Sequence, residues 1–187
     1  MLLSQKLGEY IAAAFTGIWV QSHEHPDAIT EIARMCHEKE WSLATWDIDR
    51  GLQVTGQSVA NTATDPLAAI KSINALAKDE SSALLVLSNF HKFLQSAEII
   101  QALAHQIQQG KANRTFIIIL SPLVQIPLEL EKQFVVVEHD LPDRQQLENI
   151  ARGIATETNE MPTGDDLNRL LDAAAGLTRF EAEGAYS

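Results

Sequence analysis

Cysteine is almost absent from this chain, because Cys36 is the one cysteine among 187 residues. One cysteine cannot form an internal disulfide, so the sequence gives no support for an oxidising, exported location. Cys36 lies on the apolar face of an expected helix, which favours a packed thiol over a nucleophile. Long apolar runs are missing too, since none approaches the roughly 20 residues that span a bilayer. We therefore expect a cytoplasmic location and no membrane partner.

Positive charge is also scarce. Lys and Arg together number 14 against 25 Asp and Glu, which gives a formal net charge of −11 at pH 7. A chain with this balance has no general field that attracts phosphates, and no run of basic residues interrupts it. We therefore expect no nucleic-acid partner. The apolar content of 45% is typical of a globular chain that buries a core.

Short apolar runs are what the chain has in plenty. Four or five apolar residues in a row, without alternation, indicate strands buried on both faces, as in a parallel sheet covered by helices. We expect five such strands, at 18–20, 43–46, 84–87, 116–120 and 134–137.

Helical patterns alternate with these strands. They run over residues 4–15, 26–40, 66–77 and 96–109, and Gly110 is expected to end the last of them. Asp65 is expected to cap the third helix, whereas Gly51 to Thr64 is expected to be a loop. Beyond residue 140 the patterns are helical, over 143–156 and from Asp165 to at least Ala174. This order predicts a three-layer α/β core over residues 1–140 and a small helical subdomain over 141–187.

Polar residues follow several of the expected strands. Open α/β sheets bind ligands at the carboxyl ends of their strands, so these positions are the candidate site. The candidate residues are Ser22, His23, His25, Ser88, Asn89 and Ser121.

Several stretches resemble parts of an AAA+ ATPase module of the P-loop NTPase superfamily. Leu84 to Asn89 stands where a Walker B strand and its two acids would be, and Phe116 to Pro122 resembles the sensor 1 strand. Ile126 to Phe134 resembles the segment that follows. Val135 to Leu147, with its Leu-Pro-Asp, resembles the last strand and the start of a helical lid, and Gly176 to Glu183 resembles a turn within that lid. The ordered set is similar to the degenerate amino-terminal AAA+-like domain of a bacterial, cyanobacterial and plastid AAA+ ATPase family.

Departures from the AAA+ pattern fall at the positions that carry its chemistry. A phosphate loop needs Gly-x-x-x-x-Gly-Lys-Ser/Thr, because glycine lets backbone N–H groups wrap the phosphates and lysine neutralises them. Gln21 to Asp27 has neither glycine nor lysine. Ser88 and Asn89 replace the two acids, Ser121-Pro122 replaces the sensor asparagine, and Lys132-Gln133 replaces an arginine pair. We predict that this domain does not hydrolyse ATP and holds no cofactor or metal ion.

The resemblance also implies partners. A domain of this kind belongs to a larger ATPase that uses ATP and Mg²⁺, and it assembles with a downstream AAA+ domain of the same polypeptide. A homo-oligomeric ring and a protein client are further expectations from the family. The helical pattern continues to Ser187, so we expect a truncated lid and a natural sequence that goes on.

Two other functions remain open on the sequence. One is nucleotide binding at a non-standard phosphate site built from the candidate residues. The other is a receiver-like regulatory domain, suggested by Asp47 and Asp49. A receiver needs an acid where Ser88-Asn89 stands and a lysine where His139 stands.

Two further residue groups have the types needed for metal binding or acid-base chemistry. His23 and His25, with Glu24 and His91, have the residue types of a metal site, but Pro26 disturbs the extended geometry that would align the two rings, so surface histidines of a degenerate loop are the favoured explanation. Asp47, Asp49 and Asp65 are expected to cap turns and helices instead of forming a catalytic pair.

Overall fold

The computed structural model describes residues 1–57, 64–155 and 161–187. Contacts divide the chain into two compact units, Met1–His139 and Asp140–Ser187, called here the α/β unit and the helical unit. Within the described ranges, no helix has both the length and the apolar character that a membrane span requires.

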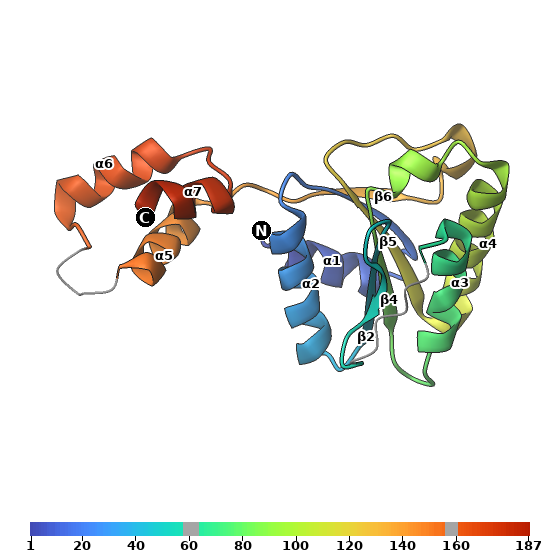
Figure 1. Ribbon diagram of the computed structural model, residues 1–187. Helices are drawn as coiled ribbons and strands as arrows, with labels where there is room; N and C mark the ends of the chain where they lie inside the picture. The colour runs from blue at the N-terminus through green and yellow to red at the C-terminus, as the bar shows by residue number, and fades with distance from the viewer. Residues whose placement is uncertain (58–63, 156–160) are drawn as a thin grey trace. The chain divides into compact units, whose positions relative to one another are not determined.

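The α/β unit is built around one six-stranded sheet with the order β3-β2-β4-β5-β1-β6. Helices α1 and α2 cover one face of the sheet, and α3 and α4 cover the other (Figure 1). The strands are β1 (Gly17–Gln21), β2 (Ser42–Asp47), β3 (Gly51–Val54), β4 (Ala83–Ser88), β5 (Thr115–Ser121) and β6 (Val135–Glu138). The helices are α1 (Leu3–Ala12), α2 (His25–Glu38), α3 (Pro66–Leu76) and α4 (Ala97–Asn113), with 3-10 turns η1 (Phe90–Phe93) and η2 (Leu128–Leu130).

Five strands run parallel, as the sequence predicts, and β3 is an additional antiparallel edge strand. The expectation of a loop from Gly51 to Thr64 is therefore wrong for Gly51–Val54, while residues 58–63 lie outside the described ranges. The carboxylate of Asp47 explains the reversal, because its Oδ1 accepts hydrogen bonds from the backbone N–H of Asp49 (3.0 Å) and Arg50 (2.7 Å). That turn folds the chain back so that Gly51 pairs with Asp47.

The core lies on both faces of the sheet. Trp19, Trp46 and Ile117 pack on the α3/α4 face, whereas Ile18 and Val20 pack on the α1/α2 face, so neighbouring residues of one strand serve opposite layers. Cys36 is 2% exposed on the α1/α2 side, and burial raises the pKa of its thiol to about 12. The prediction that Cys36 is a packed thiol is confirmed.

Gly110 lies inside α4 and does not end it, so that expectation was wrong. The helix continues to Asn113 and closes at Arg114, whose backbone is left-handed at φ 53°. A Cβ atom on Gly110 would lie 2.3 Å from the backbone oxygen of Thr115 and 3.0 Å from Cβ of Thr16. The glycine therefore permits close packing of α4 against the sheet and has no terminating role.

The helical unit contains α5 (Arg144–Ile154), α6 (Gly164–Ala174) and α7 (Arg179–Tyr186). Asp143 caps α5 by accepting a hydrogen bond from Gln146 N, and Thr178 caps α7 by accepting one from Glu181 N. The buried residues that the three helices share are Leu147, Ile150, Leu171, Ala174 and Ala182. Residues 156–160, in which the first predicted helix of this unit was expected to end, lie outside the described ranges.

Candidate functional site

The carboxyl ends of the central strands meet at one edge of the sheet. Gln21 at the end of β1 pairs with Ser121 of β5 and with Glu138 of β6, while Ser88 of β4 pairs with Leu120. The candidate residues after these strands therefore share one edge, with His139 directly after β6.

The connection from β1 to α2 is three residues long, from Ser22 to Glu24. Two hydrogen bonds hold the start of this connection: Ser22 N donates to Ser121 O (2.9 Å), and Ser22 Oγ accepts from Glu24 N (3.0 Å). Glu24 occupies the cap position of α2, Pro26 follows within its first turn, and Asp27 adds a second carboxylate there. Carboxylates stabilise the positive end of a helix dipole and oppose a second anion, and proline removes an N–H donor.

The two buried serines already have partners within the protein. Ser121 is fully buried; its Oγ accepts from Trp19 Nε1 (2.9 Å) and donates to Leu123 O (2.6 Å). Ser22 is 2% exposed, and its Oγ lies 2.7 Å from Nδ1 of His139. Both hydroxyls thus hold neighbouring segments in place.

Asn89 is the exposed candidate at the end of β4. Its backbone is left-handed, with φ 54° and ψ 28°, and its N–H extends the ladder to Leu120 O (2.8 Å). The chain then turns into η1, where Phe90 and Phe93 pack edge-on against Trp46 at 5.3 and 5.6 Å. Ser88, just before it, is half-buried.

Three histidines lie near this edge in different environments. His23 is exposed and His25 is half-buried. His91 is 5% exposed, and its Nδ1 has no hydrogen-bond partner. Burial lowers the pKa of His25, and the nearby His91 and His23 act in the same direction. The pKa of His91 is lowered by burial as well, so the rings of His25 and His91 favour the neutral form.

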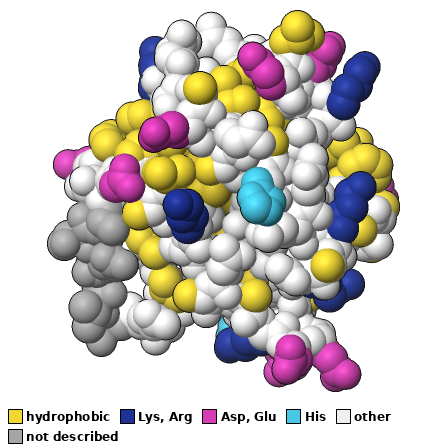
Figure 2. All heavy atoms as spheres, turned by 90° about the vertical axis from the view of Figure 1, so that its right-hand side faces the viewer, with side chains coloured by type: hydrophobic (Ala, Val, Ile, Leu, Met, Phe, Trp, Pro, Cys, Tyr) yellow, Lys and Arg dark blue, Asp and Glu magenta, His cyan; other side chains and the backbone are white. Residues whose placement is uncertain are grey.

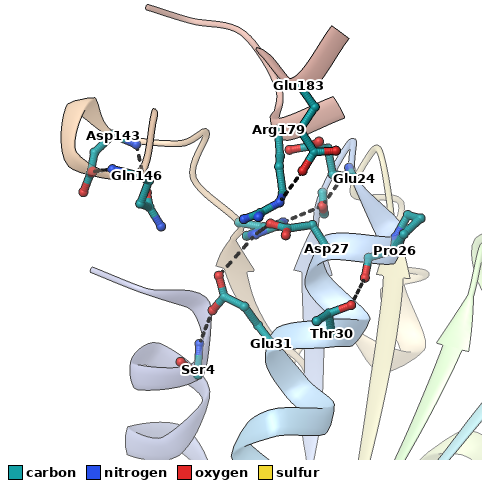
Figure 3. Close-up of polar contacts among 12 residues, drawn as sticks. Ser4, Glu24, Pro26, Asp27, Thr30, Glu31, Asp143, Gln146, Arg179 and Glu183 are labelled. Carbon is teal, nitrogen blue, oxygen red and sulfur yellow. Dashed lines mark hydrogen bonds and ion pairs between the residues drawn. The ribbon is translucent and has the colours of Figure 1, made fainter. Parts of the chain in front are cut away.

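A different cluster brings metal-ligating atoms together within the described ranges. Atoms of Asp27, Glu31 and His139 all lie within 4.8 Å of one another. Nε2 of His139 is 3.5 Å from Asp27 Oδ2 and 3.8 Å from Glu31 Oε1. Figure 3 shows Asp27 and Glu31 on successive turns of α2, with Ser4 hydrogen-bonded to Glu31.

Electrostatics within this cluster are dominated by the two carboxylates. Burial by itself lowers the pKa of His139, but the interactions with the nearby carboxylates of Asp27 and Glu31 outweigh it and raise the pKa to about 9. In return, the interaction with His139 lowers the pKa of Glu31. In the metal-free protein at neutral pH, a protonated imidazole therefore faces two carboxylates.

Sequence reasoning did not group these three residues. The spacing of four residues between Asp27 and Glu31 predicts that both carboxylates lie on one face of the helix. On the sequence, His139 stands out only as the residue at the position of a receiver's lysine. Its position beside α2 depends on the pairing of β1 with β6.

Two of the three acids that were expected to cap, Asp47 and Asp65, do so. Asp47 holds the β2–β3 turn, and Asp65 Oδ2 accepts from Ala68 N (2.9 Å) at the start of α3. Both roles were predicted, and both are confirmed.

Solved structures with the same fold are AAA+ proteins. PCH-2 of C. elegans matches with a TM-score of 0.62 at 12% identity, over 97% of this chain and 60% of that chain. A chain of the E. coli MS115-1 HORMA:CdnC:Trip13 complex matches with a TM-score of 0.62 at 9% identity, over 92% and 70%. The FIGL-1 AAA domain in complex with ADP matches with a TM-score of 0.57 at 12% identity, over 90% and 57%. This protein is thus an α/β protein of the AAA+ fold class, and it spans about 60% of the length of PCH-2.

The family follows from the sequence. Residues 3–139 match the model of the N-terminal domain of SpoVK-like AAA ATPases, so the chain belongs to that family. No curated protein sequence matches it.

The strand order removes the receiver hypothesis. Numbering the parallel strands along the chain gives the order 2-3-4-1-5, whereas receiver domains have 2-1-3-4-5.

Proposed function

We propose that this chain is a non-hydrolysing AAA+ domain, which acts as an assembly, regulatory or client-binding module beside an active ATPase domain of a larger protein. The observation that carries the proposal is the three-residue connection between β1 and α2. A phosphate loop of the Gly-x-x-x-x-Gly-Lys-Ser/Thr type requires roughly eight residues between strand and helix.

The chemistry at the amino end of α2 supports the same proposal. Backbone N–H groups at a helix start bind phosphate when glycines let them approach it. Here Glu24 stands at the cap position of the helix, Pro26 removes a donor and Asp27 adds negative charge. A triphosphate at this position would meet electrostatic repulsion and few donors.

Exposed apolar side chains support a role in protein binding. Leu128, which precedes the edge strand β6, is 82% exposed, and Val136 within β6 is 48% exposed. Exposed apolar side chains that form a contiguous patch are typical of contact surfaces, and Leu128 and Val136 are proposed to belong to such a patch. The similar Trip13 chain was solved together with a HORMA protein, which is consistent with a protein client here.

The surface over α3 and α4 is consistent with a protein partner and not a nucleic acid. On the described part of this face, Lys and Arg side chains are scattered singly among hydrophobic and acidic ones, without a basic stripe (Figure 2). Phosphate backbones are bound by clustered basic residues.

Calorimetric titration of the chain with ATP and MgCl₂ tests the nucleotide part of the proposal. We expect no Mg²⁺-dependent binding and no phosphate release, with an active AAA+ module as the positive control. Micromolar affinity that is weakened by Asn89→Ala would instead support the alternative, a nucleotide-binding domain with a non-standard phosphate site.

Substitution of exposed apolar residues in the parent protein tests the partner part. Leu128→Glu should weaken assembly or client binding at least about tenfold if Leu128 lies at a contact surface. Ile48→Glu is the matched control, because Ile48 is 54% exposed in the turn at the opposite end of the sheet order. Equal effects of the two variants, or no effect of either on assembly and client binding, would contradict the proposed surface.

A further inference from the structure

Three potential metal ligands converge between α2 and the end of β6. Asp27 and Glu31 project from successive turns of one helix, and His139 is the last residue of the α/β unit. The side chain of His139 is 6% exposed, while those of Asp27 and Glu31 are 23% and 13% exposed. The site is therefore largely shielded from solvent but can be reached from it.

Distances within the cluster suit a shared ion better than direct hydrogen bonds. Nε2 of His139 lies 3.5 and 3.8 Å from the two carboxylate oxygens, beyond the usual N–H···O range of about 2.7–3.2 Å. Two ligands of a tetrahedral Zn²⁺, with bonds near 2.0–2.1 Å, lie about 3.3–3.4 Å apart. The three ligand atoms already lie within 4.8 Å of one another.

The other polar atoms of two ligands are already held by the protein. Nδ1 of His139 is hydrogen-bonded to Ser22 Oγ at 2.7 Å, which leaves Nε2 facing the carboxylates. Glu31 Oε2 accepts from Ser4 N at 3.1 Å (Figure 3). This leaves Oε1, which lies 3.8 Å from Nε2 of His139. Metal-binding histidines and carboxylates are oriented by such outer contacts in most known sites.

We propose that Asp27 Oδ2, Glu31 Oε1 and His139 Nε2 form a site for a divalent transition-metal ion, with Zn²⁺ the best match. One imidazole and two carboxylates fit Zn²⁺ better than Mg²⁺, which prefers oxygen ligands and near-ideal octahedral geometry. Water completes the coordination. The ion stabilises the fold by joining the end of β6 to α2, and this role is independent of the function proposed above.

A proton on His139 is the competing occupant of the same position. It offsets one of the two carboxylate charges without any ion, so metal and proton compete for one nitrogen lone pair. The two occupants predict different responses to added metal, which makes them separable.

Thermal unfolding of chelator-treated protein, with and without ZnCl₂, is the first test. We expect a clear rise in Tm with Zn²⁺ and a single site by calorimetry, with little response to MgCl₂ at the same concentration. Co²⁺ should give visible absorption bands typical of a low-coordinate nitrogen and oxygen site. No rise in Tm, or an equal rise with Mg²⁺, would overturn the proposal.

Isosteric variants assign the ligands. Glu31→Gln and Asp27→Asn should each weaken Zn²⁺ binding at least about tenfold, and His139→Gln more. Glu38→Gln and His37→Gln are matched controls, because both residues are exposed at the other end of α2. Binding that survives in Glu31→Gln and Asp27→Asn, or that is lost in the controls, would overturn the assignment. Circular dichroism of each variant establishes that it is folded.

Discussion

The α/β unit and the helical unit differ in what stabilises them. The sheet of the α/β unit is covered on both faces, and all seven residues of β5 are buried. The helical unit shares a small cluster of five buried residues among three helices. Its helices rely relatively more on local contacts, such as the capping boxes at Asp143 and Thr178. A small core contributes little stability by itself, so local interactions carry more of the total there.

Because of this difference, similar core substitutions are expected to destabilise different amounts of structure in the two units. In the α/β unit, one buried side chain contacts several strands and helices, so its loss affects the whole unit. In the helical unit, loss of a core residue affects a short stretch of chain. Unfolding in two steps, with the helical unit first, is the expected behaviour of the chain.

Trp19→Ala should give the largest effect. Trp19 is fully buried in β1, packs edge-on against Phe134 at 5.7 Å, and donates a hydrogen bond to Ser121. Truncation leaves a cavity and removes one of the two hydrogen bonds of the Ser121 hydroxyl, so we expect a loss of about 3–5 kcal/mol in unfolding free energy. Urea unfolding followed by circular dichroism measures it. Trp41→Ala is the control, because Trp41 is half-buried at the start of β2, and it should cost clearly less.

Leu171→Ala should cost about 2–4 kcal/mol, but within the helical unit alone. Leu171 is 3% exposed in α6 and belongs to the small shared cluster. Amide hydrogen exchange should show lost protection in α5, α6 and α7, with unchanged protection in β4 and β5. Equal loss of protection in the sheet would show that the two units unfold together.

Exchanging glycine for alanine should change stability in opposite directions in the two units. Gly110→Ala places a Cβ 2.3 Å from Thr115 O and should destabilise the α/β unit by about 1–3 kcal/mol. Gly153 in α5 has open space around its Cα, so Gly153→Ala should stabilise the helical unit by about 0.5–1 kcal/mol. The Tm of each variant measures the effect. A shift of the same sign in both variants would contradict the prediction of opposite effects in the two units.

His91→Leu should give the smallest effect, visible as a change in pH dependence. Burial, with some contribution from Lys92, holds the pKa of His91 below its usual value of 6.5. The unfolded chain therefore binds a proton more readily, and stability is lost as pH falls below about 6.5. The variant should lose less stability between pH 7.5 and pH 5.5 than the wild type. An equally steep or steeper acid decline in urea denaturation would contradict this account.

Much of the fold could be predicted because its strands are short and apolar on both faces. Runs such as Leu84–Leu87 and Phe116–Leu120 leave little alternative to a buried parallel sheet. β3 was not predicted because Gly51–Val54 is a short edge strand. Its pairing depends on a turn that is stabilised by the carboxylate of Asp47. The expectation that Gly110 ends its helix was wrong because glycine is found both at helix ends and at sites of close packing.

The candidate site was predictable in part. Strand ends can be located from sequence, which placed Ser22, Asn89 and Ser121 at one edge. The cluster with His139 depends on which strands are neighbours, and no local pattern in the sequence reveals that β6 lies beside β1.

The short turn between β1 and α2 limits how this domain can change. Exchanging side chains within three residues cannot supply the length that a phosphate loop requires. Formation of such a loop would require an insertion of several residues, together with loss of the proline in the first turn of α2. No single substitution can therefore create a phosphate loop in this domain.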